Sequence, residues 1–110
     1  MKPWHAALAL LALGSLAGCV GLAHPDLADA ARAQALYPQA DLATLEAGRA
    51  AYVNRCAGCH ALFLPRSRTP SEWPKRVAEM EKDAKLLPGE RELITQFLVT
   101  LSSQSRDEKR

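Results

Sequence analysis

Two cysteines and a histidine near the middle of the chain carry its most specific chemical pattern. They belong to the pentapeptide Cys56-Ala57-Gly58-Cys59-His60, which has the form C-x-x-C-H. Two thiols at this spacing can each add to one vinyl group of a haem, and the adjacent imidazole can then ligate the iron. The small residues between the cysteines let the backbone lie close to a porphyrin edge. The pattern predicts one covalently bound haem c, held by Cys56, Cys59 and His60.

The same cysteine spacing also occurs in zinc sites and in dithiol redox centres. A structural zinc site uses four ligands. Apart from a cysteine in the leader region, His24 is the only further cysteine or histidine after residue 18. A thioredoxin-like centre lies beside a parallel sheet, which a helical chain does not provide. These sites remain alternatives, as does a disulfide between Cys56 and Cys59 in a purely structural protein.

The first residues have the three-part pattern of a bacterial export signal. Lys2 precedes an apolar run over residues 6–13, and small residues then lead to Cys19. The sequence LAGC that ends at Cys19 resembles the lipobox of bacterial lipoproteins. In those proteins the cysteine receives a diacylglyceryl group and the chain is cleaved just before it. The resemblance implies a signal peptide over residues 1–18 and a lipid on Cys19.

The leader also predicts a location. Simple secretion and an uncleaved anchor that continues to Ala23 are the alternatives to lipidation, and all three place the remaining chain outside the cytoplasm. In Gram-negative lipoproteins an aspartate after the lipidated cysteine favours the inner membrane. Val20 occupies that position here and leans toward the outer membrane. We expect a lipid-anchored protein on the periplasmic side of a bacterial membrane.

The remaining chain divides into three parts by composition. Residues 19–40 are rich in alanine and contain two prolines, which predicts a lipid-anchored spacer that either frays or forms a short helix around residues 27–36. Residues 41–101 contain the stronger helical patterns and are expected to form the domain. Residues 102–110 have no apolar side chain, which predicts a disordered tail.

Three helical patterns account for most of residues 41–101, and no segment alternates as a strand would. Asp41 or Thr44 can cap the first helix, and Ser71 can cap the second, which tolerates a proline in its first turn. A proline–glycine pair precedes the third. The predicted class is all-α. The apolar faces of the three helices are, in order, Leu45, Gly48, Tyr52 and Cys56; Trp73, Val77, Met80 and Ala84; and Leu93, Ile94, Phe97, Leu98 and Leu101.

Size and composition favour a bound group in the core. The chain has 110 residues, enough for one small domain, and only 5% of them are aromatic. A single hydrophobic core seldom stabilises a helical domain of roughly sixty residues without a further cross-link. A haem with two thioether bonds and an iron ligand would provide a cross-link and apolar volume at once.

The charge is too nearly balanced for a protein that binds nucleic acid. Lys and Arg number 14 against 12 Asp and Glu, which gives a formal net charge of +2. The sequence has no run of basic residues with interleaved aromatic residues. Nucleic acid is therefore not an expected partner.

These features together resemble class I cytochromes c, and the resemblance covers nearly all of residues 41–101. That family has a first helix with a glycine, an aromatic residue four positions later, and C-x-x-C-H at its end. The last helix of the family brings an aromatic residue close to that glycine. Gly48, Tyr52 and Phe97 stand at these positions here. The resemblance implies a small bundle of about three helices around a covalent haem.

The resemblance also implies a second axial iron ligand. The family takes it from a downstream methionine, and Met80 is the only methionine after residue 18. The run that begins at Trp73 resembles the W-P-x-x-V-x-x-M of some short bacterial cytochromes c, in which the methionine faces the haem. A core role for Met80, an open or water-filled position, and ligation by His24 are the alternatives. The family often binds the proximal imidazole N–H to a proline carbonyl, here that of Pro65.

The implied function is one-electron transfer between redox protein partners by a monohaem cytochrome. The sequence has no catalytic triad, paired carboxylates or phosphate loop that would indicate an enzyme. A haem-based ligand binder, sensor or small peroxidase with an open sixth position is the alternative, as is a small haem subunit of a larger oxidoreductase. A group of basic side chains could steer an acidic partner or simply form a solvated surface: Arg66, Arg68, Lys75, Arg76, Lys82 and Lys85.

Overall fold

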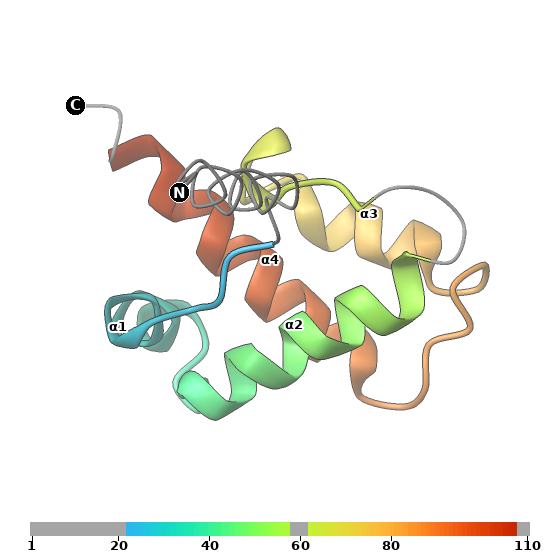
Figure 1. The fold of residues 1–110 in the computed structure, drawn as a ribbon, viewed down its shortest axis with the longest axis horizontal. Helices are drawn as coiled ribbons and strands as arrows, with labels where there is room; N and C mark the ends of the chain where they lie inside the picture. The colour runs from blue at the N-terminus through green and yellow to red at the C-terminus, as the bar shows by residue number, and fades with distance from the viewer. Residues whose placement is uncertain (1–21, 58–61, 108–110) are drawn as a thin grey trace, which may run out of the picture.

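The computed structural model describes residues 22–57 and 62–107, with side chains described as far as Ser103. These residues form helices and turns without any strand, which confirms the all-α prediction (Figure 1). They contain four α-helices where the predicted bundle has about three, because the short helix that was one alternative for residues 27–36 is formed and packs with the other three. The elements in order are α1 (Leu27–Leu36), α2 (Leu42–Cys56), the 3₁₀ helix η2 (Pro65–Ser67), α3 (Trp73–Met80) and α4 (Glu90–Asp107).

The additional helix, α1, begins at a reciprocal cap. The carboxylate of Asp26 accepts a hydrogen bond from the Asp29 backbone N–H, and the carboxylate of Asp29 accepts one from the Asp26 backbone N–H, both at 2.8 Å. The helix packs against α2 and α4. Its small buried residues form a cluster with the start of α2: Ala30, Ala33, Ala40 and Leu45. Alanines bury little apolar area each, which explains why the sequence pattern is weak here.

The chain before α1 also lies against the rest of the protein. Arg49 of α2 donates from Nη2 to the Leu22 carbonyl at 2.7 Å and from Nε to the Ala23 carbonyl at 3.3 Å. His24 Nδ1 lies 3.0 Å from a carboxylate oxygen of Glu46. Of the two alternatives predicted for residues 19–40, the short helix around residues 27–36 is present, and the residues from 22 onward pack onto the rest of the protein. Residues 19–21 lie outside the described part of the chain.

Helix α2 begins at Asp41, one of the two predicted caps. The Asp41 carboxylate accepts hydrogen bonds from the backbone N–H of Thr44 at 2.8 Å and from its hydroxyl at 2.7 Å. These bonds stabilise the charged carboxylate and lower the pKa of Asp41 below its ordinary value. The helix then runs to Cys56, the first cysteine of the pentapeptide.

Helices α2 and α4 pack against each other near the centre of the molecule (Figure 1), and their backbones come closest at Gly48. A Cβ atom on Gly48 would overlap the backbone carbonyl of Leu93 and lie 2.9 Å from the Cβ of Phe97. One turn later the rings of Tyr52 and Phe97 lie with their centroids 6.3 Å apart. The predicted meeting of Gly48, Tyr52 and Phe97 at one helix crossing is confirmed. Only glycine allows so close an approach of the two backbones.

Helix α3 is shorter than predicted at both ends. It begins at Trp73 without a side-chain cap from Ser71. The carboxylate of Glu72 accepts from the Thr69 backbone N–H at 2.7 Å, which closes the turn before the helix. Pro74 lies in the first turn as predicted. The helix ends at Met80, so Ala84 lies in the turns that follow.

Helix α4 contributes more buried residues to the core than any other helix and continues further than predicted. Its start is fixed by Glu90, whose carboxylate accepts from the Leu87 backbone N–H at 2.7 Å. Ser102 is buried and its hydroxyl donates to the Val99 carbonyl at 2.9 Å, so a polar residue here satisfies its own hydrogen bond inside the helix. The helix continues to Asp107, beyond the end of the predicted domain at residue 101, and residues 108–110 lie outside the described chain.

One hydrophobic cluster joins α2, α3 and α4. Within the described residues, none of these helices is long and apolar enough to cross a membrane. Of the predicted face of α4, Leu93 is only half-buried. The buried members of the cluster are Ala51, Tyr52, Cys56, Trp73, Val77, Ile94, Phe97, Leu98, Val99 and Leu101.

Candidate functional site

The described residues place two of the predicted haem-binding side chains at the ends of two helices. Cys56 is the last residue of α2 and is 6% exposed, within the main hydrophobic cluster. Met80 is the last residue of α3 and is half-buried. Cys59, His60 and the predicted lipidation site Cys19 lie outside the described residues. Of the predicted haem-binding residues, the structure therefore describes the surroundings of Cys56 and Met80.

Two ion pairs bring the ends of α2 and α3 to the same end of α4. Arg55, which precedes Cys56, has its Nε 2.9 Å from a carboxylate oxygen of Glu90. Glu81 follows Met80 and has a carboxylate oxygen 3.4 Å from Nε of Arg91. Glu90 and Arg91 are consecutive at the start of α4. Cys56 and Met80 are thus each adjacent in sequence to a residue that forms an ion pair with the start of α4. The sequence patterns did not predict this arrangement.

The backbones of the two helices nevertheless lie apart. Both pack against α4, but no Cα atom of α2 lies within 8 Å of a Cα atom of α3. Their buried faces contribute to one hydrophobic cluster through α4. A thiol and a thioether therefore lie at the ends of two separated helices that share one apolar support.

The charge of Glu90 is stabilised where it meets Arg55. The hydrogen bond from the Leu87 backbone N–H, and then the bond and positive charge of Arg55, lower the pKa of Glu90 below its ordinary value. Glu90 remains ionised near neutral pH, so it can both cap α4 and pair with Arg55. The same carboxylate oxygen takes part in both contacts.

Two buried aromatic side chains bind the segment that follows the pentapeptide. The hydroxyl of Tyr52 donates to the Phe63 carbonyl at 2.6 Å, and the indole Nε1–H of Trp73 donates to the Pro65 carbonyl at 2.8 Å. Trp73 and Tyr52 are each 1% exposed. Residues 63–65 are therefore attached to α2 by one hydrogen bond and to α3 by another.

The pKa of Tyr52 reflects its buried position. Burial raises the pKa to about 12, a charged thiolate on nearby Cys56 would raise it as well, and the positive charge of Arg68 lowers it. The hydroxyl therefore stays protonated at neutral pH. It remains a hydrogen-bond donor to Phe63 throughout that range.

The Pro65 carbonyl, which the family resemblance assigns to the proximal imidazole, already accepts the Trp73 indole. A carbonyl oxygen has two lone pairs, so one such bond leaves a second acceptor position. The backbone N–H of Arg68 also approaches it, at 3.4 Å, which is long for a hydrogen bond. The position of His60 relative to this carbonyl lies outside the described residues.

Large apolar side chains are exposed close in sequence to both helix ends. Phe63 is 44% exposed, Leu64 is 48% exposed and Leu87 is 54% exposed. The guanidinium of Arg68 lies 5.9 Å from the ring centroid of Phe63 and 6.0 Å from that of Trp73. The exposed ring of Phe63 is partly covered by this cation–π contact.

His24, one of the alternative ligands, lies away from Cys56. His24 pairs with Glu46, which lies ten positions before Cys56 on α2, or about 15 Å along the helix axis. The described residues contain no cluster of three or more histidine, cysteine, aspartate or glutamate side chains that could hold a metal ion. The structure does not bring His24 to either Cys56 or Met80.

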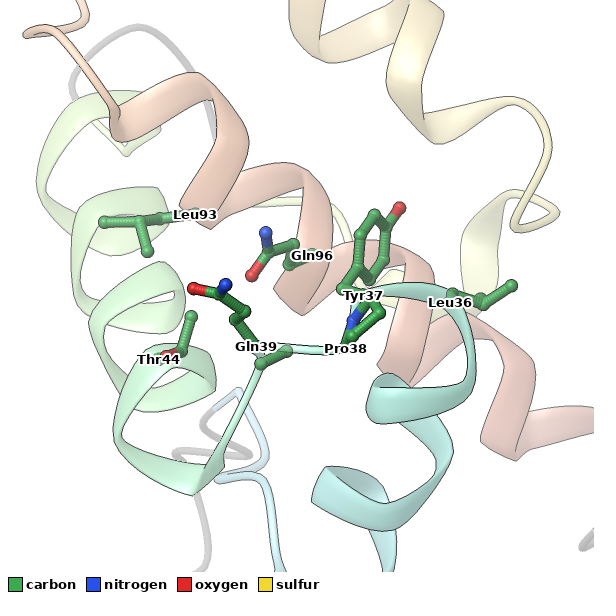
Figure 2. Close-up of a pocket in the computed structure, with 8 residues that line it drawn as sticks. Leu36, Tyr37, Pro38, Gln39, Thr44, Leu93 and Gln96 are labelled. Carbon is green, nitrogen blue, oxygen red and sulfur yellow. The ribbon is translucent and has the colours of Figure 1, made fainter.

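A separate hollow lies between the α1–α2 connection and α4 (Figure 2). Its volume is about 450 Å³, and Figure 2 shows Gln39 and Gln96 facing each other across it. The Oε1 atom of Gln96 is buried and has no hydrogen-bond partner among the described residues. Thr44 at its rim lies twelve positions before Cys56 on α2, about 18 Å along the axis. This hollow is distinct from the candidate site, and the sequence patterns did not predict it.

Comparisons with known proteins do not identify a family for this chain. No protein-family model matches the chain, and neither a curated protein nor a solved structure does. The function has to be inferred from the residues and their arrangement.

Proposed function

We propose that this protein is a monohaem c-type cytochrome that transfers one electron at a time between redox proteins. The observation that carries the proposal is the C-x-x-C-H pentapeptide at the end of α2, a helix that crosses α4 at Gly48. In the family that the sequence resembles, the attachment motif follows such a helix. The proposal includes a lipid on Cys19 and a location on the periplasmic side of a bacterial membrane.

The donor atoms near the helix ends fit a haem better than a zinc ion. Cys56 offers a buried sulfur at the end of α2, and Met80 offers a half-buried thioether at the end of α3. A thioether is an established axial ligand of haem iron, whereas structural zinc sites use thiolates, imidazoles and carboxylates.

Four residues would hold the haem. Cys56 and Cys59 would form the thioether bonds, and His60 and Met80 would be the axial ligands. A haem bound in this way supplies a couple between ferrous and ferric iron for one-electron transfer. The chain contributes apolar surroundings through the main cluster, and Tyr52 fixes the segment after the pentapeptide through Phe63.

Redox proteins are the expected partners, because an electron carrier needs a donor and an acceptor. The basic side chains around α3 are interspersed with acidic ones, and Arg76 already pairs with Glu79 at 3.1 Å. This pairing favours a solvated helix surface over a strongly positive docking face. The exposed apolar residues beside the site, Phe63, Leu64 and Leu87, provide a second kind of contact surface.

The first experiment tests haem attachment and ligation together. The full chain is produced with a bacterial cytochrome c maturation system, and haem is detected on the denatured polypeptide and by ferric and dithionite-reduced absorption spectra. We expect covalent haem with low-spin bands, and loss of covalent haem when Cys56 and Cys59 are both changed to Ser. Absence of haem from the parent chain would contradict the proposal and favour a structural protein with a disulfide.

A methionine variant then separates the electron carrier from a ligand-binding protein. Met80→Ala should convert the ferric protein from low-spin to high-spin, whereas Leu87→Ala, which shortens an exposed apolar side chain in the same region, should leave the spectrum unchanged. A parent protein that is already high-spin and binds carbon monoxide rapidly would instead indicate an open sixth position.

A further inference from the structure

The indole of Trp73 connects the two segments that are expected to present the iron ligands. Trp73 is the first residue of α3, which ends at Met80, and its Nε1–H donates to the carbonyl of Pro65 at 2.8 Å. Pro65 belongs to the segment that follows His60 in the chain. We propose that Trp73 is a positioning residue whose hydrogen bond fixes α3, and with it Met80, relative to that segment. This inference rests on the proposed function and deepens it.

The hydrogen bond is placed where its loss should matter. Trp73 is 1% exposed and Pro65 is buried, so water cannot readily replace the indole N–H when it is removed. The 3₁₀ helix that contains Pro65 and helix α3 both pack against α4. The indole hydrogen bond joins these two elements directly.

The orientation of the indole ring is fixed from a second direction. The guanidinium of Arg68 lies 6.0 Å from the ring centroid of Trp73, within the range of a cation–π contact. Trp73 and Val77 are both buried on the face of α3 that meets α4. Met80 lies seven positions after Trp73, about two helical turns, and so lies near the same face. A rotation of the ring or of the helix would displace Met80.

Tyr52 provides a matched control within the same segment. Its hydroxyl donates to the Phe63 carbonyl at 2.6 Å, two residues before Pro65. This bond attaches the segment to α2 and makes no connection to α3. Tyr52→Phe and Trp73→Phe each remove one donor and keep an aromatic ring, but only Trp73→Phe disconnects the segment from the helix that carries Met80.

The test measures how easily Met80 leaves the iron. Parent, Trp73→Phe and Tyr52→Phe holoproteins are mixed in the ferric state with added imidazole, and replacement of Met80 is followed by absorption. We expect replacement to be about three- to tenfold faster in Trp73→Phe, the range that loss of one neutral hydrogen bond implies. Tyr52→Phe should change the rate by less than about twofold. Denaturant midpoints of both variants show whether they lose similar overall stability.

Each outcome decides the inference. Faster replacement in Trp73→Phe alone supports it. Equal rates in Trp73→Phe and the parent would overturn it, and so would equal acceleration in both variants, which would indicate general loosening. A parent that binds haem without Met80 ligation overturns the positioning role and leaves haem attachment intact. A parent without haem overturns the proposed function itself, and the positioning role with it.

Discussion

The helix that ends at Cys56 and the helix that ends at Met80 are held against α4 in different ways. Helix α2 has a capped start at Asp41, a close backbone crossing at Gly48 and a buried hydrogen bond from Tyr52. Helix α3 is about half as long, has no side-chain cap and makes fewer contacts with α4. Its anchors are the buried side chains of Trp73 and Val77.

Under the proposed function, the difference separates two roles within one site. The side that carries the cysteines has a geometry fixed by backbone contact, which would suit a covalent attachment that must not move. The side that carries Met80 is anchored by a few buried side chains. Substitutions in α2 should therefore affect folding, whereas substitutions in α3 should mainly affect ligation by Met80.

The largest effect should come from Gly48→Val, which tests the rigidity of the α2 side. Any Cβ at this position overlaps the Leu93 carbonyl, so the helices must separate and the core must repack. We expect a loss of at least about 3 kcal/mol in the free energy of unfolding, measured by denaturant titration of circular dichroism. Ala47→Val, on the exposed neighbouring position, is the control. Equal stability of the two variants would show that the crossing is not close.

High pH should lower the free energy of unfolding through Tyr52, which lies on α2. The folded-state pKa of about 12 lies above the unfolded value of roughly 10, so the native state retains a proton that the unfolded chain loses. This contribution is complete below pH 10 and is lost as the pH rises toward 12, at up to about 1.4 kcal/mol per pH unit. Tyr52→Phe should reduce this slope, as urea titrations from pH 9 to pH 12 can show. An unchanged slope would mean that Tyr52 does not titrate differently in the two states.

A smaller effect on stability is expected from Val77→Ala in α3. Val77 is 1% exposed, and removal of its two methyl groups should lower the free energy of unfolding by about 1 to 2.5 kcal/mol. In the holoprotein the proportion of ferric molecules with Met80 bound should fall as well, which the absorption spectrum reports. Val53→Ala, at a half-buried position on α2, is the comparison. If Val53→Ala reduces Met80 ligation as much as Val77→Ala does, the two sides are not independent.

The smallest effect should come from Arg91→Ala, which removes the ion pair next to Met80. The side chains of Arg91 and Glu81 are 47% and 41% exposed, so we expect a loss of no more than about 0.5 kcal/mol, and less at high salt. Thermal unfolding in low and high salt measures this. A loss of several kcal/mol would show that the end of α3 depends on charge rather than on its apolar face.

Local features of the fold were predictable from the sequence. The cap at Asp41 and the buried residues of α4 follow from short-range patterns, and both are present. Helix α1 has alanines where a stronger pattern would have larger apolar residues, so its packing could not be predicted with the same force. The extension of α4 past Leu101 depends on hydroxyl-to-carbonyl bonds within the helix, as at Ser102.

Of the candidate site, the sequence predicts which residues take part but not how they are supported. The hydrogen bond from Trp73 to Pro65 and the ion pair between Arg55 and Glu90 join residues that lie on different elements. Such contacts depend on tertiary structure, and no spacing rule identifies them. The pentapeptide and Met80, by contrast, are recognisable because their chemistry depends on residue type and local spacing.

The hydrogen bonds from Arg49 to the start of the described chain have a consequence for how the protein would move. Cys19 lies only three residues before Leu22, whose carbonyl Arg49 holds. Three extended residues span about 10 Å, roughly a third of the thickness of a bilayer's hydrocarbon core. With a lipid on Cys19, the domain would lie close to the bilayer surface, because no long linker would separate it from the lipid. Its encounters with other proteins would then be confined to lateral diffusion in a thin layer next to the membrane.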